Sequence, residues 1–172
     1  MMDTNQSPAP SSSSSSALLQ GRFEGRSEFA DLVRQALAAA AAQGWREIIL
    51  CDANFEDWPL GERVVAQSLN DWSASGRKLT MLAQNYDEVT RRHARFVTWR
   101  RTWSHIVDCR GHASGDLPSV FWSPGWAFER LDVVHSTGVA GPEASRRVAL
   151  RERLAEKLLR SSPAFAATTL GI

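Results

Sequence analysis

Cysteine is scarce in this sequence, and charges of the two signs nearly cancel. The two cysteines among 172 residues, Cys51 and Cys109, are too few for a disulfide framework in a chain long enough to bury its own core. Lysine and arginine number 20 and aspartate and glutamate 19, which gives a formal net charge of +1 at pH 7. This balance creates no overall field that attracts nucleic acid or an anionic membrane, so such binding requires a local patch.

Long apolar runs are also missing. No stretch approaches the roughly 20 apolar residues of a membrane-spanning helix, and the first residues lack the basic start and apolar run of a secretory signal. We therefore expect a cytoplasmic protein with no membrane partner. Residues 1–20, rich in serine and proline, predict a disordered tail because they cannot bury enough apolar surface to offset the entropy of ordering. Residues 21–172 are expected to form a single α/β domain.

Three motifs that carry nucleotide or nucleophile chemistry are absent. The sequence contains no G-x-S-x-G, no glycine-lysine element of a P-loop and no G-x-G-x-x-G. These absences remove the main support for a serine hydrolase, a nucleoside triphosphatase and a Rossmann oxidoreductase. We expect no cofactor.

Helical and strand-like patterns alternate from residue 21 onward. Apolar residues recur at helical spacing in four segments, residues 27–44, 57–76, 86–103 and 144–162. Short apolar runs typical of buried strands occupy residues 45–54, 77–84 and 104–112, and a longer strand-rich region covers 117–135 with a break at 123–125. Helices and strands that alternate over short connections favour right-handed crossover units. The predicted fold class is α/β, with a mostly parallel sheet flanked by helices.

The order of these segments, with strands written ILCDAN, KLTMLAQN and HIVDC, resembles one half of a phospholipase D-like fold. The similarity covers roughly residues 22–165 and is greatest to an uncharacterised proteobacterial branch of that superfamily. Catalysis in the superfamily requires His-x-Lys followed by aspartate, with histidine as the nucleophile. The four histidines, His93, His105, His112 and His135, are followed two positions later by Arg95, Val107, Ser114 and Thr137.

The missing lysine implies a member of the superfamily without its catalytic motif. The resemblance therefore implies a non-catalytic binding or regulatory module, of the kind that acts on an unknown ligand or protein partner. Half of a pseudo-symmetric fold also implies a homodimer as one expected assembly.

Polar side chains follow the predicted strands. Ligands of open parallel sheets collect beyond the carboxyl ends of the strands, so we identify a candidate ligand-binding cluster there, comprising Asp52, Asn54, Asn85, Arg110 and His112. An enzyme that uses this cluster for acid/base chemistry is one alternative. The other is structural, because Asp and Asn also follow strands to form turns and cap the next helix.

Residues 91–103, RRHARFVTWRRTW, concentrate cationic and aromatic side chains. At helical spacing Phe96, Trp99 and Trp103 share one face, which predicts that the aromatic residues belong to the core and that arginine stems lie along its rim. The alternative is a weak nucleic-acid-binding surface formed by the five arginines, Arg91, Arg92, Arg95, Arg100 and Arg101.

His105, Cys109 and His112 have a spacing that invites comparison with a metal site. In a strand, however, His105 and Cys109 would lie about 13 Å apart, at roughly 3.3 Å per residue, too far to share one ion. We predict no metal site.

Overall fold

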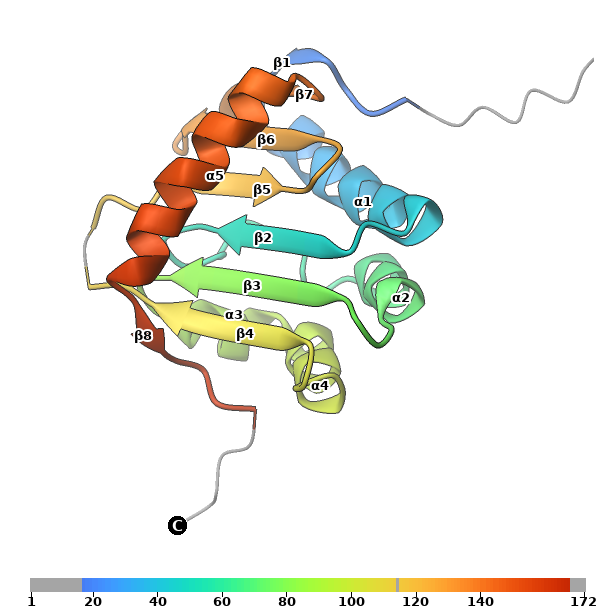
Figure 1. Ribbon diagram of the computed structural model, residues 1–172, viewed down its shortest axis with the longest axis vertical. Coiled ribbons are helices and arrows are strands. Elements are labelled where there is room, and N and C mark those ends of the chain that lie inside the picture. The colour runs from blue at the N-terminus through green and yellow to red at the C-terminus, as the bar shows by residue number, and fades with distance from the viewer. Residues whose placement is uncertain (1–16, 114, 168–172) are drawn as a thin grey trace, which may run out of the picture.

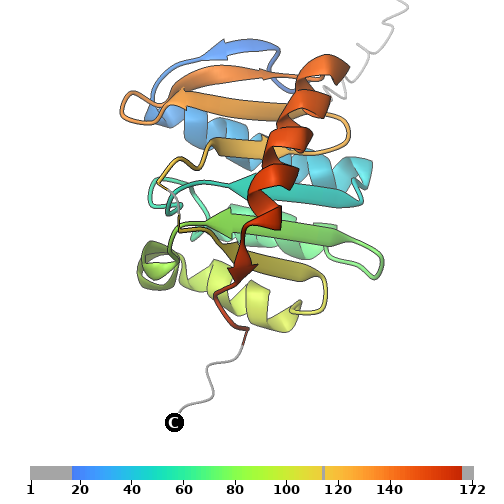
Figure 2. The same cartoon turned by 60° about the vertical axis from the view of Figure 1, so that its left-hand side comes forward.

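The computed structural model describes residues 17–113 and 115–167, which form an eight-stranded mixed sheet with helices on both faces (Figure 1). The strand order is β1-β7-β6-β5-β2-β3-β4-β8. Helices α1 to α4 lie behind the sheet in Figure 1, and α5 crosses its front diagonally, an arrangement that the turned view in Figure 2 confirms. The predicted tail lies mostly outside the described residues, since residues 1–16 are not among them.

The centre of the sheet is parallel. It consists of β2 (Glu47–Cys51), β3 (Lys78–Ala83) and β4 (Val107–Gly111), paired in that order. The connecting helices are α1 (Arg26–Gln43), which precedes β2, then α2 (Arg63–Trp72), α3 (Asp87–Arg92) and α4 (Ala94–Thr102). These segments agree with the alternation that the sequence predicts.

The rest of the sheet is antiparallel. Its strands are β1 (Gly21–Phe23), β5 (Ser119–Trp122), β6 (Ala127–Asp132), β7 (Thr137–Gly141) and β8 (Ser162–Pro163). Five of the seven neighbouring strand pairs are antiparallel, so the prediction of a mostly parallel sheet is wrong. The physical reason is the connections: β5, β6 and β7 follow one another through short turns, which join only antiparallel neighbours.

Two hydrophobic cores hold the layers together. The larger lies between the sheet and α1 to α4, and rings of Phe29, Trp58 and Phe128 meet at its centre with centroids 5.5 to 5.6 Å apart. The smaller lies under α5 (Ala144–Leu159), where Leu150 and Leu154 cover the other face of the sheet. Since α5 is one helix against four, this second face is only partly covered (Figure 2).

Helix ends follow from local sequence in one case and from tertiary contacts in another. Gly44 ends α1 with φ 67° and ψ 41°, the left-handed conformation that glycine adopts at low cost, as the sequence predicts. The helix predicted over 86–103 is instead divided at His93, which has φ −120° and ψ 56°. His93 is buried, and its Nε2 donates a hydrogen bond of 2.8 Å to the Phe55 carbonyl. A long-range contact thus replaces the continuous helix.

Packing reaches N-terminal to residue 21. Leu18 and Leu19 are partly buried against the larger core, and Trp126 Nε1 donates to the Leu19 carbonyl at 2.9 Å. The last residues of the predicted tail therefore belong to the packed domain.

Candidate functional site

A polar cavity of about 560 Å³ lies at the carboxyl end of β2. Asp52 and Asn54 line it, together with Arg92 from α3 and the exposed tip of the β6–β7 hairpin at Val133 and Val134. The remaining residues of the predicted ligand-binding cluster do not line this cavity. The structure therefore brings together only two of the five.

A buried arginine, Arg130, neutralises two of the three carboxylates that line the cavity. The Arg130 guanidinium donates to Asp52 Oδ1 at 3.0 Å and to Asp57 Oδ2 at 2.6 Å. It also donates to the hydroxyls of Ser119 and Ser136, at 3.1 and 3.3 Å. Because burying a charge is costly unless it is paired and hydrogen-bonded, this network is what allows an arginine inside the domain.

Both carboxylate oxygens of Asp52 accept hydrogen bonds. While Oδ1 binds Arg130, Oδ2 accepts hydrogen bonds from the backbone N–H of Phe55 at 2.8 Å and of Asn54 at 3.2 Å. These contacts fix the turn that follows β2. The geometry makes Asp52 a structural anchor, and leaves it no free oxygen with which to act as a general base.

Asn85, Arg110 and His112 serve other parts of the fold. Asn85 Oδ1 accepts from the Asp87 backbone N–H at 3.4 Å, at the start of α3. Arg110 donates to the Ser161 hydroxyl at 3.0 Å and carbonyl at 2.9 Å, and so ties β4 to the segment after α5. The His112 backbone N–H extends the β4 pairing to the Ala83 carbonyl.

The arginines of residues 91–103 do not form one cationic face. Arg91 and Arg92 both form ion pairs with Glu88, and Arg92 also contacts Glu56 at 3.2 Å. Arg95 donates to the Gly61 carbonyl at 2.9 Å. Arg100 is 7% exposed, so its charge is withdrawn from the surface. Of the core residues predicted here, Phe96 and Trp99 are buried and Trp103 is half-buried.

Basic side chains also lie where the parallel strands begin. We call this surface the strand-entry edge and define it by three residues, Arg46, Lys78 and His105. All three are exposed, and within residues 17–113 and 115–167 none of them forms an ion pair with a carboxylate. Sequence reasoning missed this cluster because its members are far apart in the chain.

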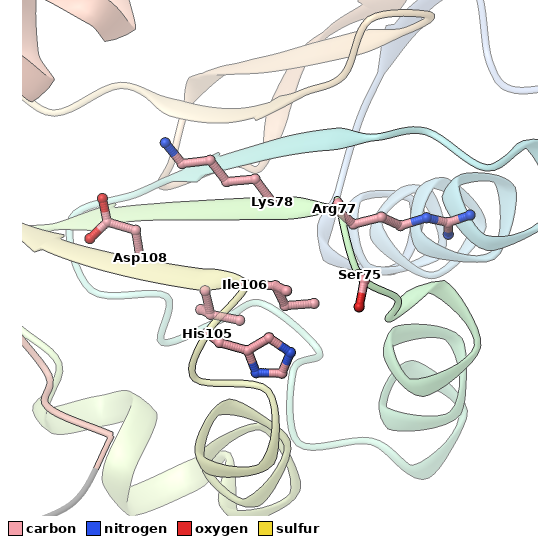
Figure 3. A pocket seen from close by; sticks show the side chains of 8 residues that line it. Ser75, Arg77, Lys78, His105, Ile106 and Asp108 are labelled. Atoms are coloured by element: carbon pink, nitrogen blue, oxygen red, sulfur yellow. The ribbon is translucent and has the colours of Figure 1, made fainter.

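Backbone pairing holds the strand-entry edge together. The Lys78 N–H donates to the Arg46 carbonyl and the Leu79 N–H to the Ile106 carbonyl, both at 2.9 Å. A shallow pocket of about 410 Å³ lies there, with Lys78, His105 and one carboxylate, Asp108, in its lining (Figure 3). The centroid of the half-buried Trp103 ring lies 5.6 Å from that of the His105 ring.

Neither thiol nor the tyrosine is activated. Burial raises the pKa of Cys109 to about 11, an effect that the nearby Arg100 guanidinium opposes. Burial also raises the pKa of Cys51 and that of the Tyr86 hydroxyl far above their usual values. All three groups are therefore neutral near pH 7, which makes them poor nucleophiles or bases.

Among the residues that the structure describes, no three His, Cys, Asp or Glu side chains are grouped so that they could hold a metal ion. His105 and Cys109 lie on either side of the start of β4, His105 exposed and Cys109 buried. In the same part of the chain no helix is both long and apolar enough to cross a membrane.

Comparison with known proteins shows a likeness in fold. No protein-family model and no curated protein matches the sequence. Among solved structures, that of TrmBL2, an archaeal chromatin protein with a novel mode of DNA binding, superposes with a TM-score of 0.64 at 13% identity. The match covers 88% of this chain and 56% of TrmBL2, so this chain spans little more than half of that protein.

The structural match bears on the predicted fold class. The phospholipase D-like resemblance rested on the order of the elements and is not tested by the match, whereas the mostly parallel sheet predicted with it is contradicted by a mixed sheet that superposes on a chromatin protein. The comparisons give the phospholipase D-like resemblance no support.

Proposed function

We propose that this chain binds nucleic acid through phosphate contacts at the strand-entry edge. The observation that carries the proposal is the set of cationic side chains there that no carboxylate neutralises within the described residues. Charge of this kind attracts the phosphate backbone independently of base sequence. Since the chain has a net charge of only +1, the affinity is low, and because the contacts are to phosphates it falls as the salt concentration rises.

The spacing of the strand-entry edge suits a nucleic-acid backbone. Neighbouring strands are about 4.8 Å apart, and Arg46 and Lys78 extend from adjacent strand starts, so they can contact successive phosphates of one strand. Trp103 adds an aromatic ring beside His105. An exposed part of such a ring can stack on an unpaired base. Asp108 lies in the same pocket and weakens the attraction.

TrmBL2 supports the proposal at the level of the fold. It is a DNA-binding chromatin protein, and the shared fold covers 88% of this chain. Because the match covers only 56% of TrmBL2, the assignment of DNA binding to the shared part belongs to the proposal.

The experiment measures binding of a labelled, mixed-sequence 20-base-pair DNA duplex by fluorescence anisotropy at several salt concentrations. Two or three phosphate contacts predict a slope of log Kd against log salt of about 2 to 3. Arg46→Gln combined with Lys78→Gln is expected to weaken binding about tenfold at low salt and to lower that slope by about 2.

The matched control is Arg91→Gln combined with Arg92→Gln, which removes the same charge from side chains already paired with Glu88. We expect this variant to stay within about twofold of wild type, because a paired arginine contributes little to phosphate binding. Equal losses in both double variants, or an affinity that does not depend on salt, would contradict the proposal.

A further inference from the structure

Arg100 is a buried cation without a counter-charge in the described part of the chain. It lies in α4 with 7% exposure, and neither its Nε nor its Nη1 has a hydrogen-bond partner there. Its Nη2 makes one long contact, 3.4 Å, to the Phe165 carbonyl oxygen. Arg130, the other buried arginine of the domain, binds two carboxylates and two hydroxyls. Arg100 therefore has capacity for an anion that Arg130 does not have.

A short segment after α5 covers Arg100. We call residues 162–167 the C-terminal strap. The Ala164 N–H donates to the Cys109 carbonyl at 3.0 Å, and the Phe165 ring stacks on Tyr86 with centroids 5.0 Å apart and planes 10° from parallel. The strap thus links the edge of β4, beside which β8 lies in Figure 1, to Arg100 of α4.

The strand pairing of the strap is short, although Ala164 and Phe165 also pack against the larger core. Its strand β8 has two residues, Ser162 and Pro163, both exposed and paired only with Arg110 and Gly111. Phe165 has φ 49°, a left-handed conformation that bulky residues rarely adopt. Segments with short pairing and exposed hydrogen bonds open at low free-energy cost. The strap can therefore lift without unfolding the sheet.

We propose that Arg100 forms a binding site for a phosphate-type oxyanion and that the C-terminal strap is its movable cover. A guanidinium offers a planar fork of N–H donors that matches the oxygens of phosphate. In the closed structure the Phe165 carbonyl occupies one direction of this fork, at a distance longer than a good hydrogen bond. An entering phosphate replaces that carbonyl at Nη2 and accepts a second hydrogen bond from one of the two nitrogens that otherwise have no partner, Nε or Nη1.

Two neighbours of the guanidinium carry no charge. The Cys109 thiol contacts Arg100 but is neutral near pH 7, because burial raises its pKa to about 11. Tyr86 is likewise neutral, and its single hydroxyl proton lies between the Arg110 and Met81 carbonyls, at O···O distances of 2.7 and 3.1 Å. The site therefore has one fixed positive charge and no fixed negative charge among these neighbours.

The first experiment follows thermal unfolding of the whole chain as inorganic phosphate replaces sodium chloride at constant ionic strength. At phosphate concentrations about 100 times Kd, the unfolding midpoint of wild type is expected to rise by about 5 to 10 °C. Arg100→Met should abolish the rise, whereas Arg101→Met, the exposed neighbour, should retain it. A rise that survives Arg100→Met, or no rise in wild type, would overturn the proposal.

A second measurement needs no variant. Hydrogen exchange of wild type with and without phosphate reports on the amide of Ala164, whose hydrogen bond to Cys109 breaks when the strap lifts. We expect phosphate to speed exchange of this amide at least about threefold and to leave amides of β2 unchanged. Unchanged strap exchange under saturating phosphate contradicts the movable cover.

Two further measurements of thermal unfolding identify which phosphate compounds bind and at which site. Glycerol 3-phosphate in place of inorganic phosphate tests whether the site also admits phosphate carried on a larger molecule. The combined Arg46→Gln and Lys78→Gln variant should keep the full phosphate effect, because the strand-entry edge is a separate surface. Loss of the effect in that variant assigns the phosphate to the strand-entry edge and overturns the site at Arg100.

Discussion

The two ends of the parallel strands differ in how their charges are used. At the carboxyl end, Asp52 and Asp57 are bound by the buried Arg130. At the strand-entry edge, Arg46 and Lys78 face solvent, with no ion pair to a carboxylate in the part of the chain that the structure describes. Polar residues at the end where ligands usually collect are thus devoted to stability, while the opposite end keeps its charge available. A position in the fold is therefore an incomplete guide to function until the partners of each side chain are known.

The contrast between the two ends of the parallel strands depends most on Arg130, which we expect to be essential for stability. We expect Arg130→Met to cost about 3 to 5 kcal/mol in the free energy of unfolding, because it leaves the Asp52 and Asp57 carboxylates near an apolar core without their cation. Urea unfolding monitored by tryptophan fluorescence measures this loss. Arg153→Met is the control, since its pair with Glu129 is half-exposed and should contribute less than about 1 kcal/mol. Similar losses in both variants would refute a special role for Arg130.

A second prediction, with a smaller expected effect, concerns the influence of Asp108 on DNA affinity at the strand-entry edge. Asp108 is the carboxylate that shares the pocket with Lys78 and His105. Asp108→Asn removes a like charge from the path of a phosphate, so DNA affinity at low salt should rise about twofold to threefold, equivalent to about 0.5 kcal/mol. The same anisotropy titration measures it. If affinity falls instead, Asp108 orients the cations and does not merely oppose the phosphate.

The smallest effect concerns an ion pair on the helix layer, far less buried than that of Arg130. Arg34 donates to Glu62 at 2.6 Å, and this hydrogen bond lowers the pKa of Glu62 from its usual 4.5. A lowered folded-state pKa stabilises the protein above pH 4.5, and this contribution disappears as the pH falls through the lowered value. Glu62→Gln should therefore cost less than about 1 kcal/mol at pH 7, after allowance for solvent screening, and close to nothing near pH 2. A difference that persists in acid would mean that Glu62 acts through packing.

Features with local causes were predictable from sequence. The strands β2 and β3 are short, largely apolar runs, and Gly44 supplies the left-handed end of α1, so each appears in the sequence as a short pattern. In the antiparallel part, β5 and β6 lie within the strand-rich region predicted over 117–135, whereas β7 and β8 have no such pattern. Strand β7 reads TGVAG, and β8 has two residues, so their pairing depends on neighbours distant in the chain.

The candidate sites show the same division. Arg130 lies two residues after the buried Phe128 in β6, and side chains two residues apart in a strand share a face. This spacing places the arginine on the inner face, although the identity of its partners depends on the fold. Arg46, Lys78 and His105 come from three separate strand starts, and only the register of β2, β3 and β4 brings them together. The neutralisation of Arg92 by Glu56 likewise depends on a tertiary contact.

The positions of β1 and β8 have a mechanical consequence. These strands, nearest the two ends of the described chain, lie at opposite edges of the eight-stranded sheet (Figure 1). With strands about 4.8 Å apart, the edges are separated by roughly 34 Å. Hydrogen bonds between antiparallel strands run across the sheet, so tension applied through residues 17 and 167 acts along them. Force therefore first separates β1 from β7 and β8 from β4, one strand pair at each margin, and both separate at low force.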